Sequence, residues 1–203
     1  MSHTQDGALV LADISGFTAF VSATELEHGP PMIAALLEEV IKELSPPLEI
    51  QEVEGDAVFA VGPDAALGSP ARLLEVLDKA FAAFKSRQRE FEADESCDCR
   101  ACRSVGSLDL KIVVHHGRFL RQQVGGHSQV AGQDVILAHR LLKNRLVRRA
   151  AYLLLTDAAL RWLGLDPDAA NLASHDERYE YLGEVRCFVK DFVEPLSLVP
   201  AVA

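Results

Sequence analysis

The sequence has no long hydrophobic run and no excess of basic residues. Its apolar runs, such as Ala8–Ala12, are far shorter than the roughly 18 residues that cross a bilayer, so we expect no membrane association. The first residues lack the basic start and apolar stretch of a secretion signal, which favours a cytoplasmic protein. Against 30 Asp and Glu there are only 20 Lys and Arg, a net charge of −10. Binding to phosphate backbones needs clustered cations, so we expect no nucleic-acid partner.

Cysteine is scarce and unevenly placed. Cys97, Cys99 and Cys102 are close together in a chain that has only four cysteines, and Cys187 is remote. A secreted disulfide scaffold would be smaller and more evenly cross-linked. In a reducing compartment a C-x-C-x-x-C cluster is typical of metal ligands, and structural Zn²⁺ takes four Cys or His ligands. The alternative is three reduced thiols on a loop. The candidates for a fourth ligand are Cys187, His115, His116, His175 or a residue of a second chain.

The composition otherwise matches an ordinary globular protein. Hydrophobic residues make up 49% and charged residues 25% of the 203 residues, enough for a packed core. This length predicts one domain over residues 1–203, and no internal repeat is present. The polar, cysteine-bearing segment at about residues 92–107 is predicted to be a loop inserted into that domain.

Hydrophobic periodicity, with Pro and Gly as boundaries, predicts alternating strands and helices. The expected helices are 30–45, one that begins at Pro70, Gln133–Arg149, and a short one that Thr156 caps and Gly164 closes. The expected strands are Gly7–Ile14, Leu48–Val53, Asp56–Val61, Leu108–Val114, Ala151–Leu155 and Tyr179–Val189, the last extended or hairpinned with a bulge at Gly183. The order opens as βαββαβ. It predicts an α+β fold with a ferredoxin-like core, helices on one face of an antiparallel sheet, and extra C-terminal strands and a helix.

Two carboxylates are expected at one end of this sheet. Asp13 ends the first strand, and Asp56 starts the strand after the hairpin at Glu54-Gly55. In a βαββ arrangement these strands are neighbours, and paired carboxylates suit Mg²⁺ or Mn²⁺. The alternative is that Asp13 caps a turn and Asp56 is an ordinary hairpin residue.

A loop that could bind phosphate follows Asp13 directly. It consists of Ser15, Gly16, Phe17 and Thr18 and leads toward a helix. Backbone N–H groups at such a position can cradle a phosphate.

Several of these segments together resemble the class III nucleotidyl cyclases, over roughly residues 8–190. Asp13-Ile-Ser-Gly-Phe-Thr18 is similar to the family's strand-end signature, and Glu54-Gly-Asp-Ala57 to its Gly-Asp hairpin. Lys111–Gly117 and Val130–Arg140 are similar to a later strand and to the start of a helix. More narrowly, the chain resembles a bacterial cyclase-related family of undefined function that carries the C-x-C-x-x-C insert and the helix motif His139–Asn144.

The resemblance implies a fold, a ligand and roles for individual residues. It implies that Asp13 and Asp56, with the Ile14 carbonyl, hold a two-metal Mg²⁺ or Mn²⁺ site for a nucleoside triphosphate. Arg140 would face the transition-state phosphate as the catalytic residue. Glu52 stands at the base-reading position, as in guanylyl cyclases, and Gln129 stands at its partner position. Class III cyclases form their sites between two subunits, so the resemblance also implies a homodimer.

Other positions depart from the cyclase pattern. Ile136 stands where the family has an Asn that binds the transition state, four residues before Arg140. Leu182 stands where the family has a phosphate-binding Lys. Losing one such amide donor costs on the order of 10²–10³ in rate. The residues that could substitute are Lys190, Arg186 and Asn144. We therefore predict a nucleotide- and metal-binding protein with a degenerate cyclase site and a role in signalling. The alternative is an active cyclase, a lyase of altered base specificity.

Overall fold

The computed structural model describes residues 3–146 and 151–192, which form one eight-stranded sheet flanked by helices. The strands are β1 (Thr4–Ser15), β2 (Glu49–Glu54), β3 (Ala57–Pro63), β4 (Asp109–Val124), β5 (His127–Ala131), β6 (Tyr152–Thr156), β7 (Ala173–Tyr179) and β8 (Gly183–Asp191). The helices are α1 (Phe17–Ala23), α2 (Gly29–Leu44), α3 (Asp64–Leu67), α4 (Pro70–Ala93), α5 (Arg100–Ser104), α6 (Gln133–Leu141) and α7 (Asp157–Leu163), with a 3₁₀ turn at Val105–Ser107.

The strand order confirms the predicted α+β fold and its ferredoxin-like core. The order is β2-β3-β1-β4-β6-β8-β7, with β5 paired to β4 alone. The first four strands pair antiparallel, as a βαββαβ core requires. The sheet as a whole is mixed rather than antiparallel, because β6 runs parallel to β4 after a crossover through α6.

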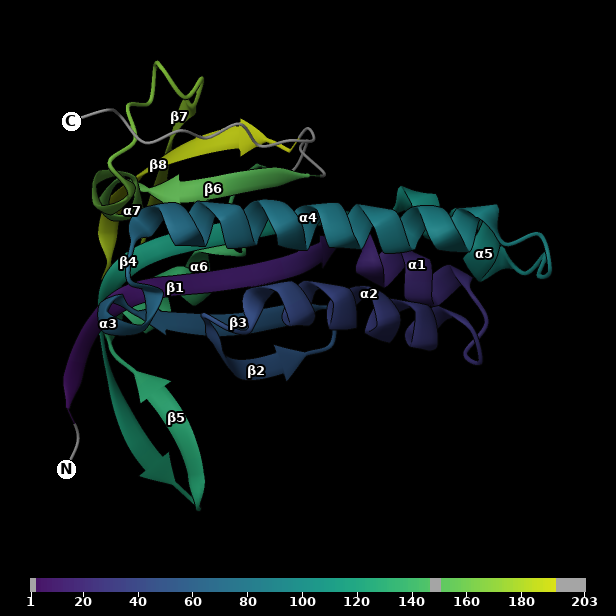
Figure 1. The fold of residues 1–203 in the computed structure, drawn as a ribbon, viewed down its shortest axis with the longest axis horizontal. Coiled ribbons are helices and arrows are strands. Elements are labelled where there is room, and N and C mark those ends of the chain that lie inside the picture. The colour runs from purple at the N-terminus through teal and green to yellow at the C-terminus, as the bar shows by residue number, and fades with distance from the viewer. Residues whose placement is uncertain (1–2, 147–150, 193–203) are drawn as a thin grey trace.

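The two faces of the sheet are covered differently. Along β1, Ala8, Val10, Ala12 and Ile14 alternate toward the side on which α2 and α4 pack, which we call the helical face. Leu9 and Leu11 alternate toward the other side, the open face, where α6 packs. Figure 1 shows α2 and α4 crossing in front of the sheet and α6 behind it. The core helices α2 and α4 therefore lie on one face, as the ferredoxin-like core predicts, whereas α6, which follows the core, covers the other face.

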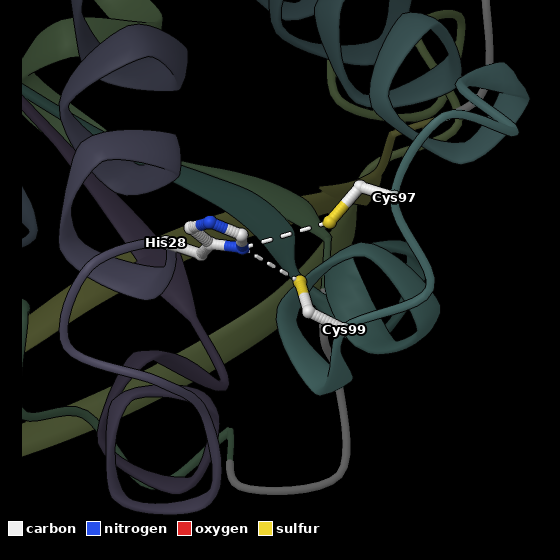
Figure 2. Close-up of side chains that lie close together, drawn as sticks. All are labelled: His28, Cys97 and Cys99. Atoms are coloured by element: carbon white, nitrogen blue, oxygen red, sulfur yellow. Dashed lines mark hydrogen bonds between the residues drawn. The ribbon is translucent and has the colours of Figure 1, made fainter.

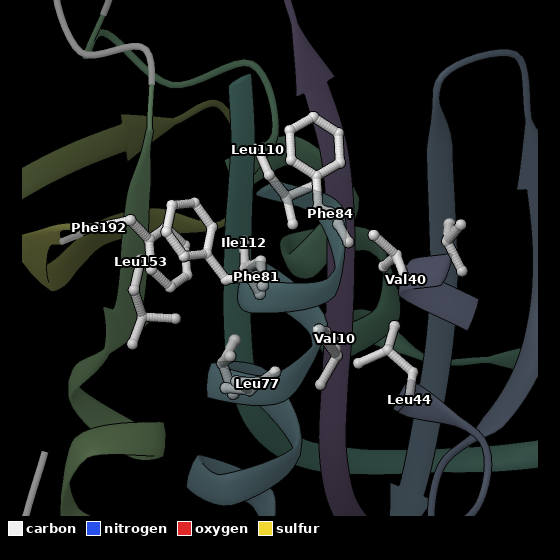
Figure 3. Close-up of a cluster of buried hydrophobic side chains, with 14 of the residues drawn as sticks. Val10, Val40, Leu44, Leu77, Phe81, Phe84, Leu110, Ile112, Leu153 and Phe192 are labelled. Carbon is white, nitrogen blue, oxygen red and sulfur yellow. The ribbon is translucent and has the colours of Figure 1, made fainter. Parts of the chain in front are cut away.

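The core of the helical face lies between α2, α4 and the sheet. Pro31 lies in the first turn of α2, and the buried positions of α2 recur at helical spacing. Figure 3 shows Leu77 of α4 and Leu44 of α2 on either side of Val10 of β1, with Phe84 of α4 beside Leu110. Phe84 and Val40 are fully buried. Among the described helices, none combines the length and apolar content that crossing a bilayer requires.

The middle of the chain differs from the predicted elements. Instead of ending at Val114, β4 continues to Val124 and turns through Gly125 and Gly126 into β5. Both glycines have positive φ, 60° and 85°, which the turn requires. The β4–β5 hairpin projects from the sheet in Figure 1. The alternation of apolar residues fades beyond Phe119, so the pattern did not reveal this arm.

Helix α6 ends at Leu141, not at the predicted Arg149; residues 147–149 lie outside the described part. The Asn144 amide donates to the Leu141 carbonyl at 2.8 Å and its oxygen accepts from the Leu146 N–H at 2.9 Å. These local hydrogen bonds satisfy backbone groups that a longer helix would have paired. At the C-terminal end, the predicted strand Tyr179–Val189 covers a turn and most of β8, and Gly183 begins β8 instead of forming a bulge. The sequence pattern does not predict its hairpin partner β7, apart from Tyr179.

Phe84→Ala tests the core of the helical face. The change removes a fully buried ring from the core between α4 and the sheet. We expect the free energy of unfolding to fall by about 3–5 kcal/mol, measured by urea denaturation. Leu26→Ala, at a side chain that is 77% exposed, is the control and should change stability by no more than about 0.5 kcal/mol. Equal effects of the two changes would contradict this account of the core.

Candidate functional site

Strand pairing brings Asp13 and Asp56 together at one end of β1 and β3. Asp13 lies opposite Ala57 in the register of β1 and β3, and Asp56 immediately precedes Ala57. The Ile14 N–H donates to the Asp56 carbonyl at 3.0 Å, which ties the two segments. Because Asp13 alternates with Leu11, its side chain lies on the open face. The Ile14 side chain is buried on the helical face, so Ile14 can contribute only through its backbone.

The charges around this pair are unbalanced. Lys111 of β4 lies opposite Asp13, and its Nζ is 2.7 Å from Asp13 Oδ2. Both side chains are largely buried, at 20% and 15% exposed. Burial raises the pKa of Asp56 above its ordinary value, and the charge of Asp13 raises it further. Two carboxylates with one ammonium partner leave a site whose donor set and charge fit a divalent cation.

The predicted phosphate loop runs from the end of β1 into α1. Gly16 has φ +88°, and its carbonyl accepts from the Phe20 N–H at 3.0 Å, which starts α1. Phe17 packs against the core of the helical face, and Thr18 is exposed. Ser15 is the last residue of β1. The loop therefore begins two residues after Asp13, at the same end of β1.

Glu52 and Gln129 line one polar hollow of about 390 Å³, although they lie on different strands, β2 and β5. Glu52 pairs with Phe59 in the register of β2 and β3, which places it on the open face. Burial raises the pKa of Glu52, and the neighbouring Glu54 raises it further. His139 of α6 also lines the hollow, and its ring meets Phe59 edge-on at 4.6 Å between centroids. The β4–β5 hairpin, which the sequence did not reveal, supplies one wall.

Arg140 and Ile136 lie one turn apart on the exposed side of α6. Ile136 is 55% exposed, and its apolar side chain offers no hydrogen bond. Within the described chain, the residues that line the hollow of Glu52 and Gln129 do not include Arg140. The hollow is thus lined by neither Arg140 nor the carboxylate pair, although the pair lies on the open face and Arg140 projects from the helix that packs there.

The three residues that could substitute for missing cyclase groups have other partners. The Asn144 amide donates to Tyr152 Oη at 2.8 Å as well as to the end of α6. Lys190 Nζ donates to the Ala170 carbonyl at 3.0 Å. Arg186 pairs with Asp176 at 3.5 Å. Leu182 lies in the turn between β7 and β8.

The cysteine cluster lies beside a histidine that the sequence reasoning missed. His28 Nδ1 is 3.0 Å from Cys99 Sγ and 3.6 Å from Cys97 Sγ, and Figure 2 shows both thiols pointing at the imidazole. Cys102 Sγ is 3.5 Å from Cys99 Sγ. Hydrogen bonding to His28 lowers the pKa of Cys99 to about 6. His28 lies far from the cysteines in sequence, and no spacing rule links them.

The four candidates named for a fourth ligand all lie elsewhere. Cys187 is buried on the open face, and His175 contacts Glu177 at 2.6 Å. His116 contacts Asp64 at 3.1 Å and stacks on Trp162. The expectation that one of these side chains, or His115, completes the cluster is corrected by the position of His28.

His115 instead joins three elements on the open face. Its Nδ1 is 2.8 Å from Thr156 Oγ1, and its Nε2 is 3.2 Å from Asp134 Oδ1. Thr156 also caps α7 by accepting from the Ala159 N–H, and Asp134 accepts from the Arg118 N–H at 2.7 Å. Each partner already has a structural hydrogen bond, so this network fixes α6 and α7 to β4.

Comparison with known proteins gives a family and a fold. A family model described as "Protein of unknown function (DUF2652)" matches residues 33–152. The uncharacterized protein Rv2561/Rv2562 of Mycobacterium tuberculosis is 33% identical over 155 residues, which cover 75% of this chain and 69% of that protein.

Among solved structures, the adenylyl cyclase CyaB from P. aeruginosa is similar with a TM-score of 0.70 and 16% identity, covering 96% of this chain and 98% of that one. The guanylate cyclase domain of RhGC from Catenaria anguillulae, solved in complex with GTP, has a TM-score of 0.64 and 13% identity, covering 93% and 97%. At these identities the likeness shows the fold, that of a cyclase catalytic domain.

The buried His115 makes stability depend on pH. Burial lowers its pKa, so the folded state binds a proton less readily than the unfolded state. The contribution to stability is complete above the unfolded pKa of about 6.5 and is lost as pH falls below it. We expect urea denaturation between pH 8 and pH 5 to show this loss in the wild type and a flatter dependence in His115→Gln. His3→Gln, at an exposed histidine, should keep the wild-type dependence. Parallel curves for all three proteins would contradict the prediction.

Proposed function

The chain belongs to the DUF2652 family of proteins of unknown function, and we propose that it binds a nucleotide and divalent metal in a degenerate class III cyclase site. The observation that carries this proposal is the position of Asp13 beside Asp56 at one end of the sheet, in a fold shared with cyclase domains. A signalling role follows from a site that recognises a nucleotide without converting it efficiently.

The metal half of the site rests on oxygen donors. Asp13, Asp56 and the Ile14 carbonyl would hold Mg²⁺ or Mn²⁺, which prefer hard oxygen ligands. Such an ion, when bound, neutralises charge on phosphate oxygens. Lys111 is paired with Asp13 in the structure, so its ammonium would have to share that carboxylate or turn toward a phosphate. The adjacent Gly16 loop would offer backbone N–H groups to the same phosphates.

The base would bind in the hollow of Glu52 and Gln129. A carboxylate can accept from both N1–H and N2–H of guanine, and the Gln129 amide can donate and accept. These two side chains line a common hollow, which supports guanine over adenine. The solved complex of the Catenaria anguillulae guanylate cyclase domain with GTP is consistent with a guanine ligand for this fold.

We expect no efficient turnover, because the chain lacks the Asn side chain with which the cyclase family stabilises the transition state. Ile136 offers no donor at that position, and Lys190, Arg186 and Asn144 are engaged with other groups. The missing donor alone costs on the order of 10²–10³ in rate. The alternative, an active nucleotidyl cyclase, is supported by Arg140, whose exposed position leaves it available to a phosphate. In that reaction the ribose 3′-oxygen would bond to the α-phosphate as pyrophosphate leaves.

A homodimer would bring the separate groups together. The carboxylate pair and the Glu52–Gln129 hollow both lie on the open face, where α6 alone among the described helices covers the sheet. Ile136 and Arg140 extend from that helix. A second copy facing this surface would cover Ile136 and could place one chain's Arg140 against the other chain's carboxylates. The cytoplasmic location and the single domain over residues 1–203 remain predictions.

Removing a carboxylate tests the metal half of the site. We expect the wild type to bind GTP in the presence of Mn²⁺, measured by isothermal titration calorimetry. Asp13→Ala and Asp56→Ala should each weaken the Mn²⁺-dependent binding at least about tenfold, a loss of about 1.4 kcal/mol or more. Asp6→Ala is the matched control, because Asp6 is an exposed residue at the opposite end of the same strand. Unchanged binding in Asp56→Ala would contradict the proposed site.

Restoring the amide tests why turnover is weak. Ile136→Asn places an amide on an exposed helix position that should tolerate the change. Incubation with each nucleoside triphosphate and Mn²⁺, followed by mass spectrometry, measures the cyclic product. We expect little or no product from the wild type and an increase on the order of 10²–10³ in Ile136→Asn. Asp56→Ala is the blank. Substantial wild-type product that is absent from this blank would establish the active cyclase instead.

A further inference from the structure

The cysteine-rich segment lies against the connection between α1 and α2. His28 is the residue that precedes α2, and Cys99 is the residue that precedes α5. Cys99 Sγ accepts from the Cys102 N–H at 3.4 Å, so the turn of α5 folds Cys102 back toward it. His28 and Cys99 therefore each lie at the start of a helix, and the starts of α2 and α5 face one another (Figure 2).

The spacing of these side chains is close to that of a tetrahedral zinc site. With Zn–S bonds of about 2.3 Å and Zn–N bonds of about 2.0–2.1 Å, tetrahedral geometry separates S from N by about 3.5 Å and S from S by about 3.8 Å. The observed N–S distances are 3.0 and 3.6 Å, and the Cys99–Cys102 distance is 3.5 Å. The donor atoms of His28, Cys97 and Cys99 all lie within 4.8 Å of one another.

Other interactions of these thiols account for the cluster less well. All four cysteines are free, and 3.5 Å is far longer than the roughly 2.05 Å of a disulfide. A thiol is a weak hydrogen-bond donor, so hydrogen bonding gives little reason to gather two thiols around one imidazole with a third thiol beside them. Three thiolates and an imidazole are a common donor set for structural Zn²⁺, and thiolates discriminate against Mg²⁺.

The two segments are also held together by contacts that need no metal. Glu25, in the α1–α2 connection, accepts from Arg100 Nε at 3.1 Å and from the Arg100 N–H at 3.4 Å. Its second oxygen accepts from the Ala101 N–H at 3.4 Å. Because Glu25 contacts the first turn of α5, the cluster is brought together before any ion binds.

The same segment reaches the loop that follows Asp13. Gln88 of α4, which is 4% exposed, donates to the carbonyls of Val105 and Leu108 at 2.8 and 2.6 Å. This fixes the end of the segment, where a Cβ added to Gly16 would lie 3.3 Å from the Ser107 carbonyl. The segment therefore contacts the chain on both sides of α1, near Gly16 before the helix and near His28 after it.

We propose that Cys97, Cys99, Cys102 and His28 form a structural Zn²⁺ site that clamps the α1–α2 connection to the cysteine-rich segment. The ion fixes α1 between this clamp and the contact at Gly16. The site is independent of the proposed nucleotide site, because it shares no ligand with Asp13 and Asp56 and uses sulfur and nitrogen donors.

Zinc content and zinc affinity test the ligand set. Protein purified without chelator is expected to contain one Zn²⁺ per chain by inductively coupled plasma mass spectrometry. Cys99→Ser and His28→Ala should each lose most of the bound zinc, and circular dichroism would verify that they fold. The controls are Cys187→Ser and His3→Ala, at a cysteine and a histidine outside the cluster, and both should retain zinc. Wild-type protein that neither contains zinc nor takes it up on titration would overturn the proposal. Full zinc in His28→Ala, with unchanged affinity, would overturn the role of His28.

Two further readouts separate this site from the nucleotide site. Asp56→Ala should retain its zinc, because Asp56 is not a proposed zinc ligand. The zinc measurement therefore tests the clamp even if the protein proves not to bind nucleotide. Removing zinc with a chelator should increase amide hydrogen exchange in residues 17–29 and 97–108 and leave β1 and β3 unchanged. Equal exchange with and without zinc in both segments would overturn the clamp.

Discussion

The central position of β1 determines where the carboxylate pair of the proposed nucleotide site lies. This strand pairs with β3 over Gly7–Asp13 and with β4 over its full length, and residues 8–12 are buried on both faces. A strand enclosed on four sides cannot shift register by one residue without reversing its two faces. The same constraint that packs Leu11 into the core of the open face therefore brings Asp13 onto that face beside Asp56.

The groups of the proposed nucleotide site are divided over the open face of one chain. Its carboxylates are concentrated near β1 and β2, with Lys111 as the cation that directly contacts Asp13. Arg140 projects from α6, outside the hollow that Glu52 and Gln129 line. Such a division suits a site completed by a second copy. It is also consistent with the proposal that the chain keeps the metal-binding half of a cyclase site and has lost donors from the other half.

Helix α1 connects the two proposed metal centres physically. It starts at Gly16, just after the oxygen donors near Asp13, and it is followed by His28, which faces the thiols. Hard oxygen ligands and soft thiolates select different ions, so the two centres would not compete for one metal. An ordered α1 would hold the Gly16 loop in place for a phosphate.

The sequence by itself determined the ferredoxin-like core and the meeting of Asp13 with Asp56. Both follow from local signals, namely hydrophobic period, proline and glycine boundaries and a tight hairpin between β2 and β3. Tertiary structure alone decided that α6 covers the open face, that the β4–β5 arm forms a wall of the hollow, and that His28 rather than His115 lies beside the cysteines. These outcomes depend on contacts between residues far apart in the chain. Periodicity shows which side of an element is buried, but it does not show which distant element covers that side.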